Sequence, residues 1–154
     1  MSLVDIIERH IKAMLEQSDD NVIMLRRNEL AQNFGCAPSQ INYVIHTRFS
    51  LERGYVTESQ RGGGGYVRII RLELDSISDL LPLMEELSRD GLNQRQAADI
   101  IAWLHEQQVI TGRELRMMQA TVDRVALDVP LPIVDQVRAR LLAAMVAAII
   151  RDRG

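Results

Sequence analysis

Apolar residues recur at helical spacing at the start of the chain. Those that fall three or four positions apart are Val4, Ile7, Ile11, Met14 and Leu15. Ser2 precedes them with a hydroxyl that can cap a helix, so we expect a helix from there to about Glu16, where QSDDN ends it. The apolar run Val22 to Leu25 then predicts either a short strand or an extended connector.

Two shorter helical patterns follow, on either side of a glycine. Asn28 is placed to cap ELAQNF, which Gly35 ends, and Pro38 suits the first turn of PSQINYVIHTRF. The residues expected to share the buried face of this second helix are Ile41, Val44 and Ile45. Two short helices joined by a turn around glycine predict a helix-turn-helix.

Two strand-like segments come next along the chain. GYVTES and GYVRIIR read as strands, with QRGGGG between them, and they predict a β-hairpin. Three helices followed by such a hairpin indicate a winged helix, in which the hairpin is the wing. Residues 1–72 are therefore expected to form a winged helix-turn-helix domain, mainly helical with a small β-hairpin.

The second half of the chain is predicted to be entirely helical. Residues 73–78 are expected to be a linker and residues 79–154 a domain of about four helices. Pro82 breaks the pattern of DSISDLLPLMEELSRDG, which predicts a kink there or a helix that begins near it. Capping-box spacings, Asn93 with Gln96 and Thr111 with Glu114, predict helices over QRQAADIIAWLHEQQ and GRELRMMQATVDRVALD.

The last predicted helix begins near Ile133 and is apolar over much of its surface. Its large apolar residues are Val134, Val137, Leu141, Leu142, Met145, Val146, Ile149 and Ile150. This face is wider than packing in one small bundle requires, so we interpret the excess as a homodimer interface. A central core helix is the alternative.

Charge divides the chain into the same two halves. The 154 residues are 47% hydrophobic and 25% charged, which is typical of a globular protein rather than a disordered one. From Arg26 to Arg71 there are seven arginines against three acids, whereas from Glu73 onward nine arginines face thirteen acids. A basic first half and an acidic second half indicate a division of labour.

Several function classes find no support in the sequence. Cys36 is the only cysteine, so no intrachain disulfide or zinc site is expected, and the compartment is predicted to be a reducing cytoplasm. The start MSLVDIIERH has no secretory signal, and the apolar run Leu141 to Ile150 is too short to span a bilayer. The three histidines lie on separate predicted helices without acid or cysteine partners at ligand spacing. We expect no metal, no cofactor and no enzymatic activity.

The glycine run of the wing invites comparison with phosphate-binding loops. RGGGGY has neither the P-loop nor the dinucleotide-binding spacing, and it lies between two strands. Arg61 suits a narrow minor groove, and glycine lets the backbone approach phosphates closely. We therefore predict DNA contact by Arg61 and by Gly62, Gly63, Gly64 and Gly65, with a plain hairpin loop as the alternative.

Amide side chains mark the second helix of the helix-turn-helix as a recognition helix. Gln40 and Asn42 can pair with adenine edges in the major groove, and Ser39 at the helix start can hold a phosphate. Tyr43, His46, Thr47 and Arg48 are also predicted to contact DNA. Arg26 and Arg27, before the first helix of the pair, are predicted to clamp the DNA backbone. The alternative is that this face is only solvated.

These residues also carry a family resemblance. CAPSQINYVIHTRFSLERGYVTESQRGGGGYVRIIR resembles the DNA-binding half of the CtsR family, the repressors of class III stress genes in Gram-positive bacteria. SQINYVI, TRF, ERGY and RGGGGY carry the likeness, and LRMM and RARLLAAM extend it into the second half.

The resemblance implies a dimeric repressor of heat-shock genes, among them those of the Clp ATPases and protease. Such repressors bind direct repeats in operator DNA, and their glycine-tipped wing is credited with sensing heat. The resemblance also implies phosphorylation of Arg61 by a protein-arginine kinase with its activator, and degradation by Clp proteases. Since a two-fold dimer most naturally reads inverted repeats, the linker Leu72 to Ser78 is the expected place for a swivel.

Three other functions stay open on the sequence. One is a winged-helix regulator controlled by a metabolite bound in the C-terminal helical domain, which a sizeable pocket with converging polar groups would favour. The others are a protein-interaction module and an enzyme that uses the glycine loop as a phosphate site.

Overall fold

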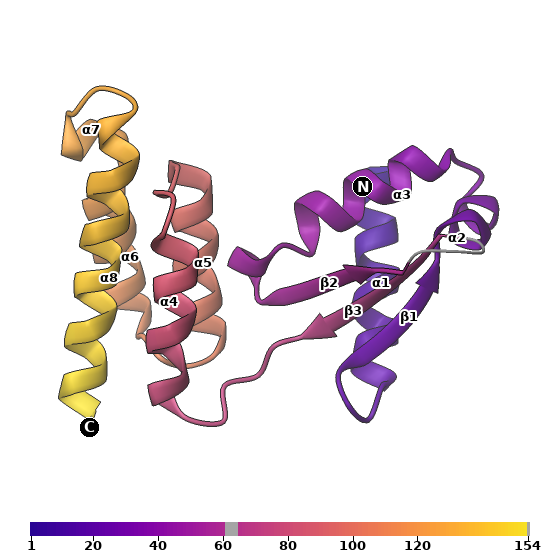
Figure 1. Ribbon diagram of the computed structural model, residues 1–154, viewed down its shortest axis with the longest axis horizontal. Helices are drawn as coiled ribbons and strands as arrows, with labels where there is room; N and C mark the ends of the chain where they lie inside the picture. Colours follow the sequence, from indigo (N-terminus) through magenta and orange to yellow (C-terminus); the bar gives the residue numbers. More distant parts are fainter. Residues whose placement is uncertain (61–64, 154) are drawn as a thin grey trace. The chain divides into compact units, whose positions relative to one another are not determined.

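The computed structural model describes residues 1–60 and 65–153. Contacts divide the chain into an N-terminal unit, Met1–Leu72, and a C-terminal unit, Glu73–Gly154 (Figure 1). The fold is mainly helical with a small antiparallel sheet, as the sequence predicts.

Over residues 1–60 and 65–72, the N-terminal unit has three helices, a 3-10 turn and a three-stranded sheet. Its elements are α1 (Leu3–Gln17), β1 (Val22–Arg26), α2 (Arg27–Phe34), α3 (Pro38–Arg48), η1 (Leu51–Arg53), β2 (Tyr55–Ser59) and β3 (Tyr66–Arg71). The strand order is β1-β3-β2 and every pairing is antiparallel. The segment from Val22 is thus a strand rather than a connector, and it adds a third strand to the wing hairpin.

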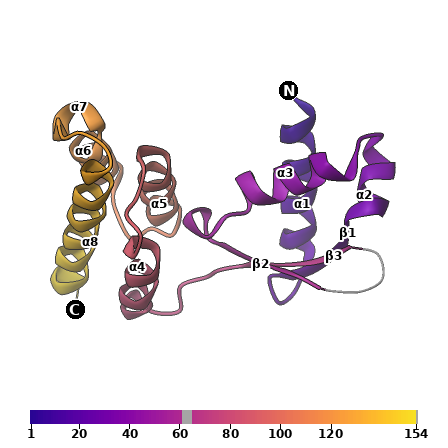
Figure 2. The same cartoon turned by 45° about the horizontal axis from the view of Figure 1, so that its top comes forward.

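Helices α1, α2 and α3 lie beside the small sheet (Figures 1 and 2). Their buried apolar residues form one core cluster with those of the strands. The core residues are Ile7, Ile11, Leu15, Leu25, Leu30, Ala31, Ile41, Val44, Ile45, Phe49, Tyr55, Val67 and Ile69. Between α2 and α3 the chain turns at Gly35, whose φ of 63° lies in the left-handed region that glycine adopts without strain. The helix-turn-helix is therefore confirmed, with its turn at the expected glycine.

One helix start differs from the sequence prediction. Asn28 does not cap α2, because β1 passes directly into the helix and the cap residue is the extended Arg26, which makes no side-chain cap bond. The strand therefore replaces the capping side chain as the element that fixes where α2 begins.

Helices are the only regular elements among the described residues of the C-terminal unit, 73–153. Its elements are η2 (Ile77–Asp79), α4 (Leu80–Ser88), α5 (Gln94–Glu106), α6 (Gly112–Val122), α7 (Arg124–Leu127) and α8 (Ile133–Arg153). Helix α8 packs against α4, α5 and α6. The buried apolar residues of α8 are Val134, Ala139, Leu142 and Val146. Buried apolar residues on α5 and α6 include Ile100, Ile101, Trp103, Leu104 and Met118.

Capping residues explain most of the helix boundaries in this unit. Both predicted capping boxes are present, at Asn93 and at Thr111. Pro82 falls in the first turn of α4, where a missing N–H removes no intrahelical bond, so the helix begins near it. The prediction of one helix over GRELRMMQATVDRVALD is wrong, because Asp123 is extended and its side chain caps a separate helix α7.

Arg138 lies in the interior of this unit with only 2% of its surface exposed. Its Nε donates to the carbonyl of Val122 at 2.8 Å, and its Nη1 donates to the carbonyl of Leu92 at 2.9 Å and to Asp135 at 2.8 Å. These partners offset the cost of burying a charge, and they tie α8 to the end of α6 and to the loop before α5.

Candidate nucleic-acid interface

Helix α3 presents a polar face to solvent and an apolar face to the core. Ile41, Val44 and Ile45 are buried. The residues predicted to contact DNA that lie exposed on the other faces are Ser39, Gln40, Asn42, Tyr43 and His46, with Tyr43 57% exposed. This separation leaves amide, hydroxyl, phenol and imidazole groups free to meet an external surface.

Two of the predicted contact residues also bond within α3. The Oε1 atom of Gln40 accepts a hydrogen bond from the peptide N–H of Ala37 at 3.2 Å, so this amide caps the helix start. The hydroxyl of half-buried Thr47 donates to the carbonyl of Tyr43 at 2.7 Å. Neither bond is visible in the pattern of exposed polar residues from which the two were predicted as DNA contacts.

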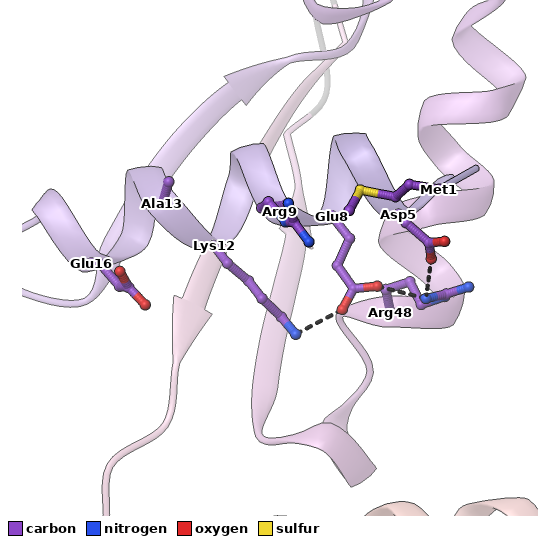
Figure 3. A pocket seen from close by; sticks show the side chains of 8 residues that line it. All are labelled: Met1, Asp5, Glu8, Arg9, Lys12, Ala13, Glu16 and Arg48. Carbon is purple, nitrogen blue, oxygen red and sulfur yellow. Dashed lines mark hydrogen bonds and ion pairs between the residues drawn. The ribbon is translucent and has the colours of Figure 1, made fainter. Parts of the chain in front are cut away.

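The charge of Arg48 is balanced inside the N-terminal unit. Its Nη1 lies 2.7 Å from Glu8 Oε1 and 3.2 Å from Asp5 Oδ1, both on α1 (Figure 3). Lys12 Nζ adds a third contact, 2.7 Å from Glu8 Oε2. These ion pairs border an open groove of about 540 Å³ along α1, and they join the end of α3 to α1. Contact of Arg48 with DNA stays a prediction.

The same network changes the acidity of its two carboxyl groups. Burial raises the pKa of Glu8, but hydrogen bonds from Lys12 and Arg48 outweigh it and hold the pKa below its ordinary value of 4.5. Hydrogen bonds from the side chain and backbone of Ser2, with a smaller contribution from Arg48, lower the pKa of Asp5. Both groups therefore favour their charged forms in the folded unit.

Arg26 and Arg27 lie at the root of the wing. The Arg26 guanidinium carbon is 4.8 Å from the centre of the Tyr66 ring, its cross-strand partner. Arg27 Nη2 donates to the hydroxyl of Ser59 at 2.7 Å, and its peptide N–H donates to the carbonyl of Gly65 at 3.2 Å. Arg27 thereby holds the end of β2 and the residue before β3.

The backbone at Gly65 favours glycine. Its φ is 67°, in the left-handed region that other residues rarely adopt, although a Cβ there would meet Arg27 only at ordinary contact distances, 3.5 Å from Nη1 and 3.7 Å from Cβ. The sequence pattern places Gly65 at the wing tip and predicts that Arg26 and Arg27 clamp the DNA backbone. The one sequence feature that indicates a structural role for Arg26 and Arg27 is their position directly after the apolar run Val22 to Leu25. Arg61, Gly62, Gly63 and Gly64 lie outside the described residues.

Metal centres and membrane-spanning helices find no candidate in the described residues. Over residues 1–60 and 65–153, no three His, Cys, Asp or Glu side chains gather as metal ligands would. In that same part of the chain, none of the helices has the length and apolar character needed to cross a bilayer.

Comparisons with known proteins agree in both halves of the chain. Residues 2–73 match the family model described as the CtsR N-terminal HTH domain, and residues 76–147 match the CtsR C-terminal dimerization domain. The chain is 45% identical to the transcriptional regulator CtsR of Geobacillus stearothermophilus over 96% of this chain and 97% of the relative. It is 43% identical to CtsR of Bacillus subtilis strain 168, over 96% of each.

A solved structure extends the likeness to three dimensions. A crystal structure of CtsR in complex with a 26 bp DNA duplex superposes with a TM-score of 0.90 and 45% identity, over 97% of this chain and 99% of the other. Fold, domain order and sequence thus all agree, and the chain belongs to the CtsR family of transcriptional regulators, which are not enzymes.

Proposed function

We propose that this chain is a dimeric transcriptional repressor that binds double-stranded operator DNA in the bacterial cytoplasm. The observation that carries the proposal is the exposed amide-bearing face of α3, set over a fully apolar core face. The solved relative bound to a DNA duplex supports it, since its fold matches nearly the whole chain.

In this function α3 enters the major groove and the wing follows the adjacent minor groove. Asn42 and the Nε2 donor of Gln40 are the base-reading groups, while Ser39 holds a phosphate. Arg61 and the glycines after it contact the minor groove, where negative potential favours a guanidinium. Arg26 and Arg27 keep the wing in place and, from that root, also reach the DNA backbone.

Fluorescence anisotropy with duplexes selected from genomic fragments tests this. Asn42→Ala is expected to weaken binding about tenfold or more and to relax specificity at one base position. Arg61→Ala is expected to lower affinity and to reduce the salt dependence by about one counterion. Gln17→Ala and Arg140→Ala, both exposed and not among the proposed contact residues, serve as controls. Unchanged affinity in both test variants would refute the proposal.

The dimer forms through the C-terminal unit and places two N-terminal units on direct repeats. Half-buried apolar residues on α8, namely Val137, Leu141, Met145, Ile149 and Ile150, support this interface. Rotation within residues 73–76, which precede η2, gives the two units the different orientations that direct repeats require. Shortening this linker is expected to weaken binding to direct repeats more than to a single half-site.

The genes under control encode heat-shock and Clp quality-control proteins, and heat releases the repressor through its wing. Ordering each glycine of the wing on DNA costs about 1–2 kcal/mol, and this cost changes little over a few degrees. The step that responds steeply to temperature is therefore a cooperative loss of wing structure. Gly64→Pro is expected to change the temperature dependence of operator affinity. An unchanged dependence would count against the wing as thermometer.

Arginine phosphorylation and Clp proteolysis complete the proposed regulation. A phosphate on Arg61 replaces an attractive charge by a repulsive one at the DNA. Arg61→Lys keeps the charge without the guanidinium, so it is expected to bind operator yet resist inactivation by a protein-arginine kinase. Loss of inactivation with retained binding supports Arg61 as the modified residue, and normal inactivation contradicts it.

A further inference from the structure

A pocket of about 750 Å³ lies in the C-terminal unit, at the start of α5, beside α7 and the first turns of α8. Its volume is in the range of small-molecule sites, about 300–1,000 Å³. The residues that line it are Asn93, Gln94, Arg95, Ala98, Arg124, Val129, Leu131, Val134, Asp135 and Arg138.

The charge of this pocket is opposite to that of its surroundings. Acids outnumber arginines by thirteen to nine from residue 73 onward, yet three arginines and a single carboxylate line the pocket. That carboxylate, Asp135, already pairs with Arg138 at 2.8 Å. Two guanidinium charges, those of Arg95 and Arg124, are left without a balancing acid among the lining residues.

Arg138 supplies a fixed donor to the pocket. Its Nε and Nη1 atoms make the bonds to Val122, Leu92 and Asp135, whereas its Nη2 atom makes no hydrogen bond to any described residue. A guanidinium held from two sides loses little freedom when a third partner binds. Arg138 is therefore ready to receive an anion.

Arg95 and Arg124 are brought together by the bonds around Gln94. The Gln94 amide accepts from the peptide N–H of Arg124 at 3.1 Å and donates to Asp123 at 3.1 Å. These bonds hold the start of α7 beside the start of α5. Both arginines are exposed, and within the described part of the chain neither guanidinium has a hydrogen bond or ion pair.

An apolar wall accompanies these donors. Ala98, Val129, Leu131 and Val134 also line the pocket, and Leu131 is 75% exposed. A purely inorganic anion gains nothing from such a wall, whereas a ligand with an apolar body buries it.

We propose that this pocket binds a small organic anion, whose phosphate or carboxylate is held by Arg95, Arg124 and Arg138 and whose apolar body packs on Val129 and Leu131. This inference is independent of DNA binding by the N-terminal unit. It gives the dimerization unit a ligand site of the kind that metabolite-controlled regulators use.

Isothermal titration of the full-length protein with phenyl phosphate tests the site. Saturable binding is expected, with affinity about tenfold lower in Arg95→Gln and in Arg124→Gln, because each variant removes a charged hydrogen-bond donor. Arg140→Gln, an exposed arginine of α8 outside the pocket, is expected to bind as the unmodified chain does. Unchanged circular dichroism checks that the variants fold.

Two further titrations test whether the pocket prefers an organic anion to inorganic phosphate. Inorganic phosphate is expected to bind more weakly than phenyl phosphate, and Leu131→Ser is expected to remove that difference. Absence of saturable phenyl phosphate binding, or equal affinity in both arginine variants and Arg140→Gln, would overturn the site. Equal affinity for the two anions would overturn the organic part of the proposal.

Discussion

The two units of this chain build similar helices but expose different kinds of surface. In the N-terminal unit, α3 turns amides, hydroxyls and an imidazole outward, and its apolar residues are fully used in the core. In the C-terminal unit, α8 buries one row of apolar residues and leaves a second row half-exposed. The first surface suits DNA and the second suits another copy of the chain, so function follows from what each helix leaves uncovered.

The two units have separate cores, and Phe49→Ala tests whether the units unfold separately. Phe49 is buried against Tyr55 with ring centres 4.8 Å apart, so truncation is expected to cost about 3–5 kcal/mol of N-terminal unit stability. The single tryptophan, Trp103, lies in the other unit, whereas all three tyrosines lie in the first. The unfolding midpoint should move to lower denaturant concentration when it is followed by tyrosine fluorescence. It should stay unchanged when it is followed by tryptophan fluorescence. A joint shift would show that the units unfold as one.

A single charge introduced into the half-exposed apolar row of α8 is expected to disrupt the proposed dimer interface. Met145→Glu places a carboxylate in the proposed interface and is expected to give a monomer in sedimentation analysis. Operator affinity should fall about 100-fold, because the two DNA-binding units no longer act together. Gln136→Glu adds the same charge at an exposed position of α8 and should leave the dimer intact. A dimeric Met145→Glu variant would place the interface elsewhere.

The wing root allows a smaller test on the N-terminal side. Ser59→Ala removes the 2.7 Å hydrogen bond from Arg27 and is expected to lower operator affinity about fivefold, the equivalent of about 1 kcal/mol. Thr57→Ala, exposed on the same strand, is the matched control. Equal affinity of both variants would mean that the wing needs no support from Arg27.

The ion pairs on α1 predict the smallest effect, a change in pH dependence. Because the pKa of Glu8 is lowered on folding, its contribution is present above pH 4.5 and is lost as the pH falls through the folded-state value. Glu8→Gln is expected to cost about 0.5 kcal/mol at neutral pH and to flatten the acid limb of N-terminal unit stability. Urea unfolding between neutral and acid pH measures this, and an unchanged acid limb would contradict it.

Periodicity and capping residues were sufficient to predict most of the fold. Ser2, Gly35, Asn93 and Thr111 each act locally, so their effect on helix ends can be inferred from neighbouring residues. Strand β1 was ambiguous, because its partners on β3 lie 40 to 48 residues away along the chain, from Arg26↔Tyr66 to Val22↔Ile70. The break at Asp123 was missed, since an aspartate inside a helical pattern gives no sign of its backbone angle.

The candidate site was predicted in its exposed part and missed in its internal bonds. Asn42 and Tyr43 could be placed on an outer face from helical spacing alone. Partners of Arg48 and Arg27 come from α1 and β2, 40 and 32 residues away, and no local pattern encodes such pairs. Charge alone cannot separate an arginine that meets DNA from one that pairs with a carboxylate.

The direct passage of β1 into α2 limits how this domain can be re-engineered. Arg26 and Arg27, the residues at that junction, contact Tyr66, Ser59 and Gly65 of the hairpin. A chimaera that receives the hairpin of another regulator would lose these matched partners. Transplantation of a foreign hairpin into this scaffold therefore has to include the two arginines, or recipient positions that accept them.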